Sequence, residues 1–345
     1  MAQLDGLRAF AVMAVVIHHY TPGGWDYGAD SGVKLFFTLS GFLITGILLR
    51  TRVDAEAGNL KPLTALARFY IRRFLRIFPL YYFVVAAAVV INLEPARREI
   101  VSLLTYTFNI HMAHQGWFEA NFAHFWSLSV EEQFYICWPW LVLFLPPDWL
   151  TSAVLSIVSL GPLYRFSYIL SGYRNMTDLS TYISTFSCLD SLGLGSLLAV
   201  FIHRGCISRS LMHRMNRLLL PAALLGSAAV VWFANGNVRL IVHDPIRATV
   251  FCCIICAASN GIVGPVGRFL EWKLFVYIGK ISYGIYVYHP LMLVLSSLIL
   301  IKTTGLALPE QSLPVSTLAV LLTLCIASLS WHFMEKPINN LKRYF

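Results

Sequence analysis

Apolar runs of about 20 residues follow one another along almost the whole chain, separated by short polar or basic connections. One helical crossing of a hydrocarbon core about 30 Å thick needs roughly 20 predominantly apolar residues. The composition agrees, since 57% of the 345 residues are hydrophobic and 12% are charged, against about 25% charged in soluble domains. Because backbone polar groups in lipid must be satisfied within each span, we expect an all-α, polytopic transmembrane helix bundle.

The apolar runs and the residues between them predict about ten spans. They cover roughly residues 7–21, 32–50, 77–93, 127–146, 151–170, 183–203, 218–235, 246–264, 275–300 and 314–334. An even number of spans places both termini on one side of the membrane. Because no long linker or internal repeat divides the chain, we expect one membrane domain over residues 1–345.

Basic residues are concentrated in the connections on the N-terminal side of the bundle. The connections 50–76 and 204–217 and the C-terminal tail are rich in Lys and Arg. This pattern predicts cytoplasmic termini and a multi-pass protein of the plasma (inner) membrane. The formal charge of +9 then reflects topology and contact with membrane lipids, not nucleic acid. Arg97 and Arg98, in an expected outer loop, fit this topology least well.

The expected outer loop, residues 94–126, is rich in aromatic residues and histidine. Aromatic side chains gather at membrane–water interfaces without any role in binding. The alternative is a platform on which sugar rings stack. The residues concerned are Tyr106, Phe108, His111, His114, Trp117, Phe118, Phe122, His124, Phe125 and Trp126.

Two ionisable residues share one face of the first span. Arg8 and His19 are eleven residues apart, about three helical turns, which places their side chains roughly 16 Å apart on one face. An ionisable residue inside a span is costly to insert and usually faces the bundle interior or a water-filled cavity. His19 is therefore a candidate functional residue. His18, about 100° further round the helix, is expected to reach the interface.

Six segments together resemble the acyltransferase-3 family of membrane enzymes, and they occur in the family's order. They are residues 4–8 followed by His19, and then 32–44, 72–79, 125–135, 281–290 and 335–337. Because the segments extend over nearly the whole chain, the resemblance is specific. It implies an acyltransferase that moves an acyl group, commonly acetyl, from cytoplasmic acyl-CoA to a hydroxyl of a cell-envelope, extracellular or lipid-linked glycan.

Acyl-CoA is the donor that this resemblance implies, as a substrate and not as a bound cofactor. Its phosphates suit arginine, whose planar, permanently charged guanidinium matches phosphate oxygens. Arg73 and Arg76 lie three residues apart, and so on one face, at the expected cytoplasmic end of the third span. Ordinary anchoring by positive charge is their alternative role. Arg8 either pairs with Asp5 or faces the donor.

His19 and Glu131 are the candidate catalytic residues. Imidazole titrates near neutral pH, which suits a general base that removes the proton of the acceptor hydroxyl. A covalent acyl-histidine is the alternative role for His19. The family's motif places a glutamate after Val130, and Glu131 is expected at the outer end of the fourth span, where a carboxylate orients a nearby imidazole. Glu132 points about 100° away.

Asp190 is a second carboxylate inside an expected span. The family often has arginine two residues before this aspartate, whereas this chain has Cys188. Asp190 is then either protonated in lipid or paired with a residue of another helix. Three further site candidates are His289, Ser40 and Tyr135. His289 can equally be a polar residue at a proline-associated bend, and Ser40 can bond to its own helix.

No metal site is expected. Cys252, Cys253 and Cys256 lack the nearby fourth ligand that a structural zinc site needs. Gly193 and Gly195 do not follow a strand, so they are expected to allow close helix packing and not to bind a nucleotide.

Two other functions stay open. A proton-coupled transporter or flippase of envelope precursors would relay protons through its intramembrane ionisable residues, namely His19, Glu131, Asp190 and His289. A non-catalytic partner of an envelope assembly would need none of these side chains.

Overall fold

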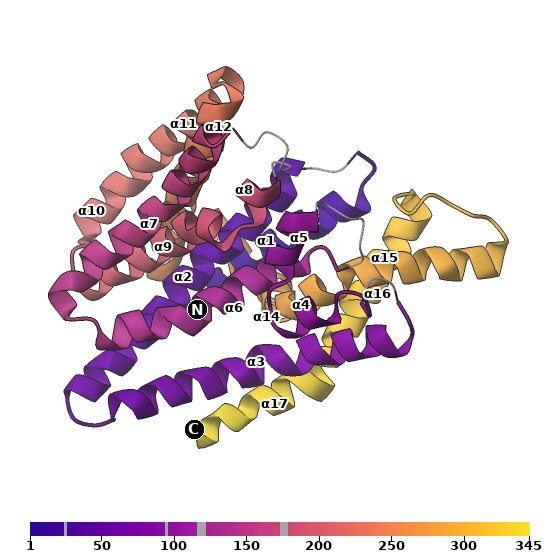
Figure 1. Ribbon diagram of the computed structural model, residues 1–345, viewed down its shortest axis with the longest axis horizontal. Helices are drawn as coiled ribbons and strands as arrows, with labels where there is room; N and C mark the ends of the chain where they lie inside the picture. The colour runs from indigo at the N-terminus through magenta and orange to yellow at the C-terminus, as the bar shows by residue number, and fades with distance from the viewer. Residues whose placement is uncertain (24–25, 94–95, 116–121, 173–178) are drawn as a thin grey trace.

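The computed structural model describes residues 1–23, 26–93, 96–115, 122–172 and 179–345, and it contains no strand within them. The expected all-α membrane bundle is confirmed (Figure 1). Its long helices are α1 (Ala2–Tyr20), α2 (Asp26–Glu56), α3 (Pro62–Val90), α6 (Phe125–Phe144), α7 (Pro147–Leu170), α9 (Thr185–His203), α11 (Leu220–Phe233), α12 (Gly236–Asn260), α15 (Ser282–Thr304) and α16 (Leu313–Ser330).

Shorter helices connect these elements. They are α4 (Ile100–Leu104), α5 (Phe108–Gln115), α8 (Leu179–Ile183), α10 (Arg209–Arg214), α13 (Pro265–Leu270), α14 (Lys273–Lys280) and α17 (Lys336–Asn340). Two π-helical turns, Met215–Leu219 and Trp331–Glu335, join α10 to α11 and α16 to α17, and a 3₁₀ turn covers Leu341–Tyr344.

Nine of the ten expected spans each overlap one long helix, and the remaining span, 275–300, covers parts of α14 and α15. Within the described ranges, eight helices are long and apolar enough to cross a membrane. The two expected spans outside that set, α1 and α6, contain polar groups that include His18, His19, Glu131 and Glu132. Ten crossings and cytoplasmic termini therefore stay predictions.

Several helix boundaries differ from the expectation, among them those of α2, which extends past both ends of its expected span, and the start of α12 at Gly236. The third helix begins at Pro62, well before residue 77, because proline suits a first helical turn and the basic stretch that follows has good helix propensity. The ninth apolar run is divided at Ile281 into α14 and α15. The short helix α14 packs on α1 so closely that a Cβ at Gly279 would lie 1.9 Å from the carbonyl oxygen of Asp5.

The helix α2 lies at the centre of the bundle and packs against α1, α6, α9 and α12. Figure 1 shows α10, α11 and α12 at one edge of the molecule and α15 and α16 at the opposite edge, while α3 and α17 run side by side along a third. The N-terminal half of α2 lies beside the C-terminal half of α1, since Gly32 contacts Ala11 and Val15. The two helices therefore form an antiparallel pair.

Glycines allow α2 and α9 to approach each other. A Cβ at Gly195 would lie 2.0 Å from the carbonyl oxygen of Thr38, and one at Gly41 would lie 1.9 Å from that of Leu192. Real Cβ atoms do not come this close to backbone, so any side chain at either position would force the helices apart. The packing role expected of Gly195 is confirmed.

Replacing Gly195 by alanine is expected to destabilise the protein by about 1–3 kcal/mol, as other overpacked sites do. Thermal unfolding of the detergent-solubilised protein would measure the loss. Gly46→Ala is the matched control, because Gly46 lies in α2 with open space around its Cβ position. A Gly195→Ala protein as stable as the control would contradict the packing role.

Candidate active site

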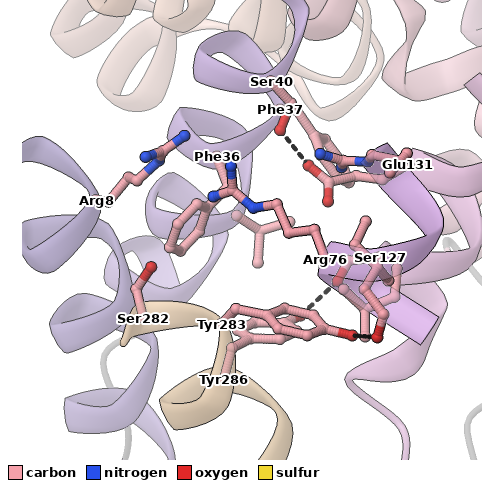
Figure 2. Close-up of a pocket in the computed structure, with 14 residues that line it drawn as sticks. Arg8, Phe36, Phe37, Ser40, Arg76, Ser127, Glu131, Ser282, Tyr283 and Tyr286 are labelled. Carbon is pink, nitrogen blue, oxygen red and sulfur yellow. Dashed lines mark hydrogen bonds between the residues drawn. The ribbon is translucent and has the colours of Figure 1, made fainter. Parts of the chain in front are cut away.

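A polar cavity of about 100 Å³ lies inside the bundle between α1, α2, α3, α6 and α15. Figure 2 shows Arg8, Arg76 and Glu131 around it, with the Ser40 hydroxyl donating to Glu131. The Ser40 Oγ to Glu131 Oε1 distance is 2.5 Å. The lining is completed by Val33, Phe36, Phe37, Arg73, Ile77, Ser127, Leu128, Ser282, Tyr283 and Tyr286.

Arg73 forms part of the wall between this cavity and the outside of α6. Its guanidinium carbon lies 3.6 Å from the ring centroid of Tyr135, a cation–π contact. Its Nε atom lies 3.8 Å from Oε1 of Glu132. The candidate Tyr135 thus supports an arginine of the cavity, a contact that the sequence did not indicate.

A basic vestibule of about 670 Å³ adjoins the polar cavity. It lies where the C-terminal end of α2, the start of α3 and the C-terminal segment of the chain meet. Asp54 is the single acidic residue in its lining, which includes seven cationic residues: Arg50, Arg68, Arg72, Arg73, Arg76, Lys342 and Arg343. Arg73 and Arg76 line both spaces. They therefore form the boundary between a strongly cationic entrance and the cavity that contains Glu131.

Imidazole rings from three segments of the chain lie in contact near the C-terminal end of α1, and the ring of His18 lies beside that of His19, with centroids 4.9 Å apart. The ring centroids of His19 and His289 are 4.9 Å apart, and those of His289 and His124 are 5.1 Å apart. This histidine cluster, His19, His124 and His289, adjoins the polar cavity through Tyr286, whose ring lies 5.7 Å from His289. The hydroxyls of Tyr286 and Ser127, two cavity residues, are hydrogen-bonded to each other.

Hydrogen bonds to backbone carbonyls determine the neutral tautomer of each ring. A carbonyl only accepts, so the proton lies on Nδ1 of His19, which faces Val15 O at 2.9 Å, and on Nδ1 of His289, which faces Tyr286 O at 2.7 Å. By the same reasoning Nε2 of His124 carries its proton. Each ring keeps one unprotonated nitrogen. Those of His124 and His289 are buried without a hydrogen-bond partner.

No hydrogen bond or ion pair joins His19 to Glu131, contrary to the expected pairing. Glu131 accepts from Ser40 and lines the arginine-bearing cavity, whereas His19 contacts His289. Ser127 of α6 bonds to Tyr286, which contacts the histidine cluster, and Glu131 lies one helical turn further along α6. Glu132 faces Arg73 on the far side of α6.

Arg8 satisfies both of the roles left open for it. Its Nη1 atom donates to Oδ1 of Asp5 at 3.0 Å, and its side chain lines the polar cavity. An aspartate one turn away therefore holds this guanidinium at the cavity's edge.

Asp190 is paired with another helix. Its partner is Arg165 of α7, which also contacts Asp244 of α12 at 2.9 Å. Lys34 of α2 contacts the same Asp244 at 2.8 Å and lies 3.6 Å from the sulfur of Cys188. Arg165 therefore supplies the counter-ion that the cysteine at position 188 cannot provide.

Arg247 extends this buried ion network to the start of α2. It pairs with Asp30 and with Asp244, the latter at 2.5 Å. The six groups of the network carry no net formal charge, since three are acidic and three are basic. Sequence reasoning missed Lys34, Arg165 and Arg247, although each is a charged residue within or beside an expected span, which is itself a signal of function or of pairing.

The aromatic residues of the expected outer loop are mostly buried where the structure describes them. Tyr106 stacks on Tyr81 with ring centroids 4.4 Å apart, and Phe108, Phe122, Phe125 and Trp126 are core residues. Burial raises the pKa of Tyr106 far above its usual range. Trp117 and Phe118 lie outside the described residues. For the described rings, packing within the bundle accounts for the aromatic content.

The comparisons with known proteins identify the family of the chain. The model of the acyltransferase domain, acyltransferase-3, matches residues 1–332. The chain belongs to the acyltransferase-3 family. Its similarity extends to O-acetyltransferase OatA of Staphylococcus aureus, which is 27% identical over 370 residues, covering 98% of this chain and 57% of the relative.

Two further relatives of this acyltransferase-3 chain are named for peptidoglycan. A putative peptidoglycan O-acetyltransferase, YrhL of Bacillus subtilis, is 30% identical over 373 residues, with 98% of this chain and 54% of the relative covered. Peptidoglycan O-acetyltransferase OatA of Listeria monocytogenes is 28% identical over 371 residues, which cover 99% of this chain and 56% of the relative. The chain spans little more than half the length of these relatives. No solved structure matches it.

Proposed function

We propose that this chain is a membrane O-acyltransferase domain that transfers an acetyl group from acetyl-CoA to a glycan hydroxyl. One observation carries the proposal: Arg73 and Arg76 connect a cationic vestibule to a polar cavity, and the histidine cluster adjoins that cavity on its other side. The names of the relatives favour acetyl as the acyl group and peptidoglycan as the acceptor.

The vestibule suits the phosphates of acyl-CoA. Its cations are clustered in one space with a single carboxylate, and guanidinium groups bind phosphate oxygens through paired hydrogen bonds. We place this end of the bundle in the cytoplasm of the plasma membrane, where the donor is available and where basic residues are retained. The thioester arm then passes between Arg73 and Arg76 into the polar cavity.

The reaction forms an ester bond and breaks a thioester bond, so one proton must move from the acceptor hydroxyl to the departing thiolate. We assign the uptake of that proton to His19, because its Nδ1 donates to Val15 O and its Nε2 keeps a lone pair. A covalent acyl-histidine on the same nitrogen is the second route. In both routes His19 acts at the end of the cavity away from the vestibule.

Glu131 acts on the donor side in this mechanism. It accepts a hydrogen bond from Ser40 and lies in the same cavity as Arg73 and Arg76. A carboxylate there limits the excess of positive charge and fixes the arginines in place. The His19 ring is oriented instead by its hydrogen bond to Val15 O and its contact with the His289 ring.

Transfer of labelled acetate would test this function against the transporter alternative. Purified protein in proteoliposomes receives acetyl-CoA labelled in the acetyl group and soluble peptidoglycan fragments. We expect the label to become alkali-labile and bound to sugar. A transporter or a non-catalytic partner would leave no label on the glycan, and that result would overturn the proposal.

Replacing Arg76 by glutamine is expected to raise KM for acetyl-CoA by about 10–100-fold, since a charge-assisted hydrogen bond contributes roughly 1.5–3 kcal/mol. Initial rates at varied donor concentration would measure it, and higher salt is expected to weaken donor binding in the unchanged protein. The control is Arg214→Gln, because Arg214 is exposed and lines neither space. Equal KM values in the two variants would remove Arg76 from the donor site.

A further inference from the structure

A second polar cavity, of about 420 Å³, lies between α2, α7, α8 and α12. We call it the α12 cavity. Its lining includes Asp30, Arg165, Tyr182, Arg239, Leu240 and His243. None of these residues lines the vestibule or the cavity that contains Glu131. Its volume is within the range of about 300–1,000 Å³ that is usual for small-molecule sites.

The α12 cavity lies at the end of the bundle that carries His19. Asp30 stands near the start of α2, a few residues after α1 ends at Tyr20, whereas Arg50 of the vestibule stands near the other end of α2. The cavity and the vestibule therefore open toward opposite faces of the membrane. A molecule that enters the α12 cavity approaches from the side opposite to the donor.

Aromatic contacts connect the α12 cavity to the polar cavity. The ring of Tyr182, in the wall of the α12 cavity, lies 5.0 Å from the ring of Trp126. The ring of Trp126 lies 6.0 Å from that of Phe37, which lines the polar cavity. The two cavities are therefore joined through the side chains of Tyr182, Trp126 and Phe37.

The lining presents hydrogen-bond donors and acceptors without an excess of either charge. Arg165 and Arg239 are balanced by Asp30 and Asp244, which also lines the cavity. Two buried side-chain atoms of lining residues, Nε of Arg165 and Oδ1 of Asp30, have no hydrogen-bond partner. Unpaired buried polar atoms are costly, so the polar groups of this lining are not fully satisfied within the protein. A lining with balanced charges fits a ligand that has both donors and acceptors and carries no net charge.

We propose that the α12 cavity binds a sugar ring of the acceptor glycan, next to the ring that is acylated. A sugar presents several hydroxyls, each of which donates and accepts, and its apolar face packs on an aromatic ring such as Tyr182. This inference rests on the proposed function, and it adds where the acceptor is held. It also predicts that the enzyme prefers an oligosaccharide to a single sugar, because only the oligosaccharide fills both positions.

The test compares acetyl transfer to a peptidoglycan-derived tetrasaccharide with transfer to a monosaccharide. Leu240→Trp fills the cavity without altering an ion pair, and Val238→Trp is its matched control, since Val238 lies on the same helix but is exposed and outside the lining. We expect Leu240→Trp to raise KM for the tetrasaccharide at least tenfold. Rates with the monosaccharide and KM for acetyl-CoA should stay unchanged.

Equal tetrasaccharide KM values for Leu240→Trp and Val238→Trp would overturn the inference. If the unchanged protein labels neither acceptor, the proposed function itself fails. Retained binding of acetyl-CoA shows that a variant is folded. If Leu240→Trp no longer binds acetyl-CoA, Arg239→Gln replaces it in the test, because this substitution shortens a polar side chain of the lining without adding volume. Its KM for the tetrasaccharide is then compared with that of Val238→Trp.

Discussion

Replacing His19 by glutamine is expected to lower the rate of acetyl transfer by about 10²–10⁴-fold, the range that a positioned general base contributes. Glutamine keeps the polarity of the side chain and fills similar space, but it offers no nitrogen that can take a proton at neutral pH. The contacts of the vestibule are left intact. KM for acetyl-CoA is therefore expected to change little while kcat falls.

Initial-rate measurements on purified protein, together with its abundance in the membrane fraction, would test the His19 prediction. His203→Gln is the control, because His203 is exposed and lines neither the polar cavity nor the vestibule. We expect His203→Gln to keep near-normal rates. Full activity in the His19→Gln protein would remove this residue from the mechanism, while the family assignment would stand.

Replacing Arg165 by leucine is expected to destabilise the protein by about 3–5 kcal/mol, the usual cost of removing one partner from a buried ion pair. Arg165 is 1% exposed and contacts two carboxylates, Asp190 and Asp244. Without it the fully buried Asp190 loses its principal counter-ion. The loss of stability comes from an uncompensated buried charge, so it should exceed the loss caused by replacing an exposed arginine.

Thermal unfolding in detergent, at fixed lipid and salt, would measure the Arg165→Leu effect. Arg268→Leu is the control, since Arg268 is exposed. The double variant Arg165→Leu with Asp190→Asn should recover part of the stability, because it removes the orphaned charge along with its partner. A double variant that is less stable than Arg165→Leu alone would show that the pair is not the cause.

Patterns that depend on one helix were predictable from the sequence. The shared face of Arg73 and Arg76 followed from a spacing of three residues, and both line the same cavity. The close-packing role of Gly195 followed from the absence of a side chain in an apolar run. Family resemblance added residues that periodicity alone could not single out, above all Glu131, which the motif distinguished from its neighbour Glu132.

Relations between helices were harder to predict. Glu131 was expected beside His19, yet Glu131 accepts a hydrogen bond from Ser40, and His19 donates to Val15 O and contacts the ring of His289. The depth of a side chain depends on the tilt and offset of its helix, and these depend on packing against neighbours. One turn of offset is enough to exchange one partner for another.

A helical membrane protein of the acyltransferase-3 family could be inferred from the amino-acid sequence, because the length of hydrophobic runs and the order of motifs are local properties that lipid and chemistry constrain directly. The pairing of charged residues became visible in the folded bundle. The pairing of Asp190 with Arg165 joins residues 25 positions apart, and the histidine cluster joins α1, α15 and the residue before α6. Such contacts depend on how the helices pack. In lipid an unpaired polar group is costly, so the stable packing is one in which the buried polar groups are paired.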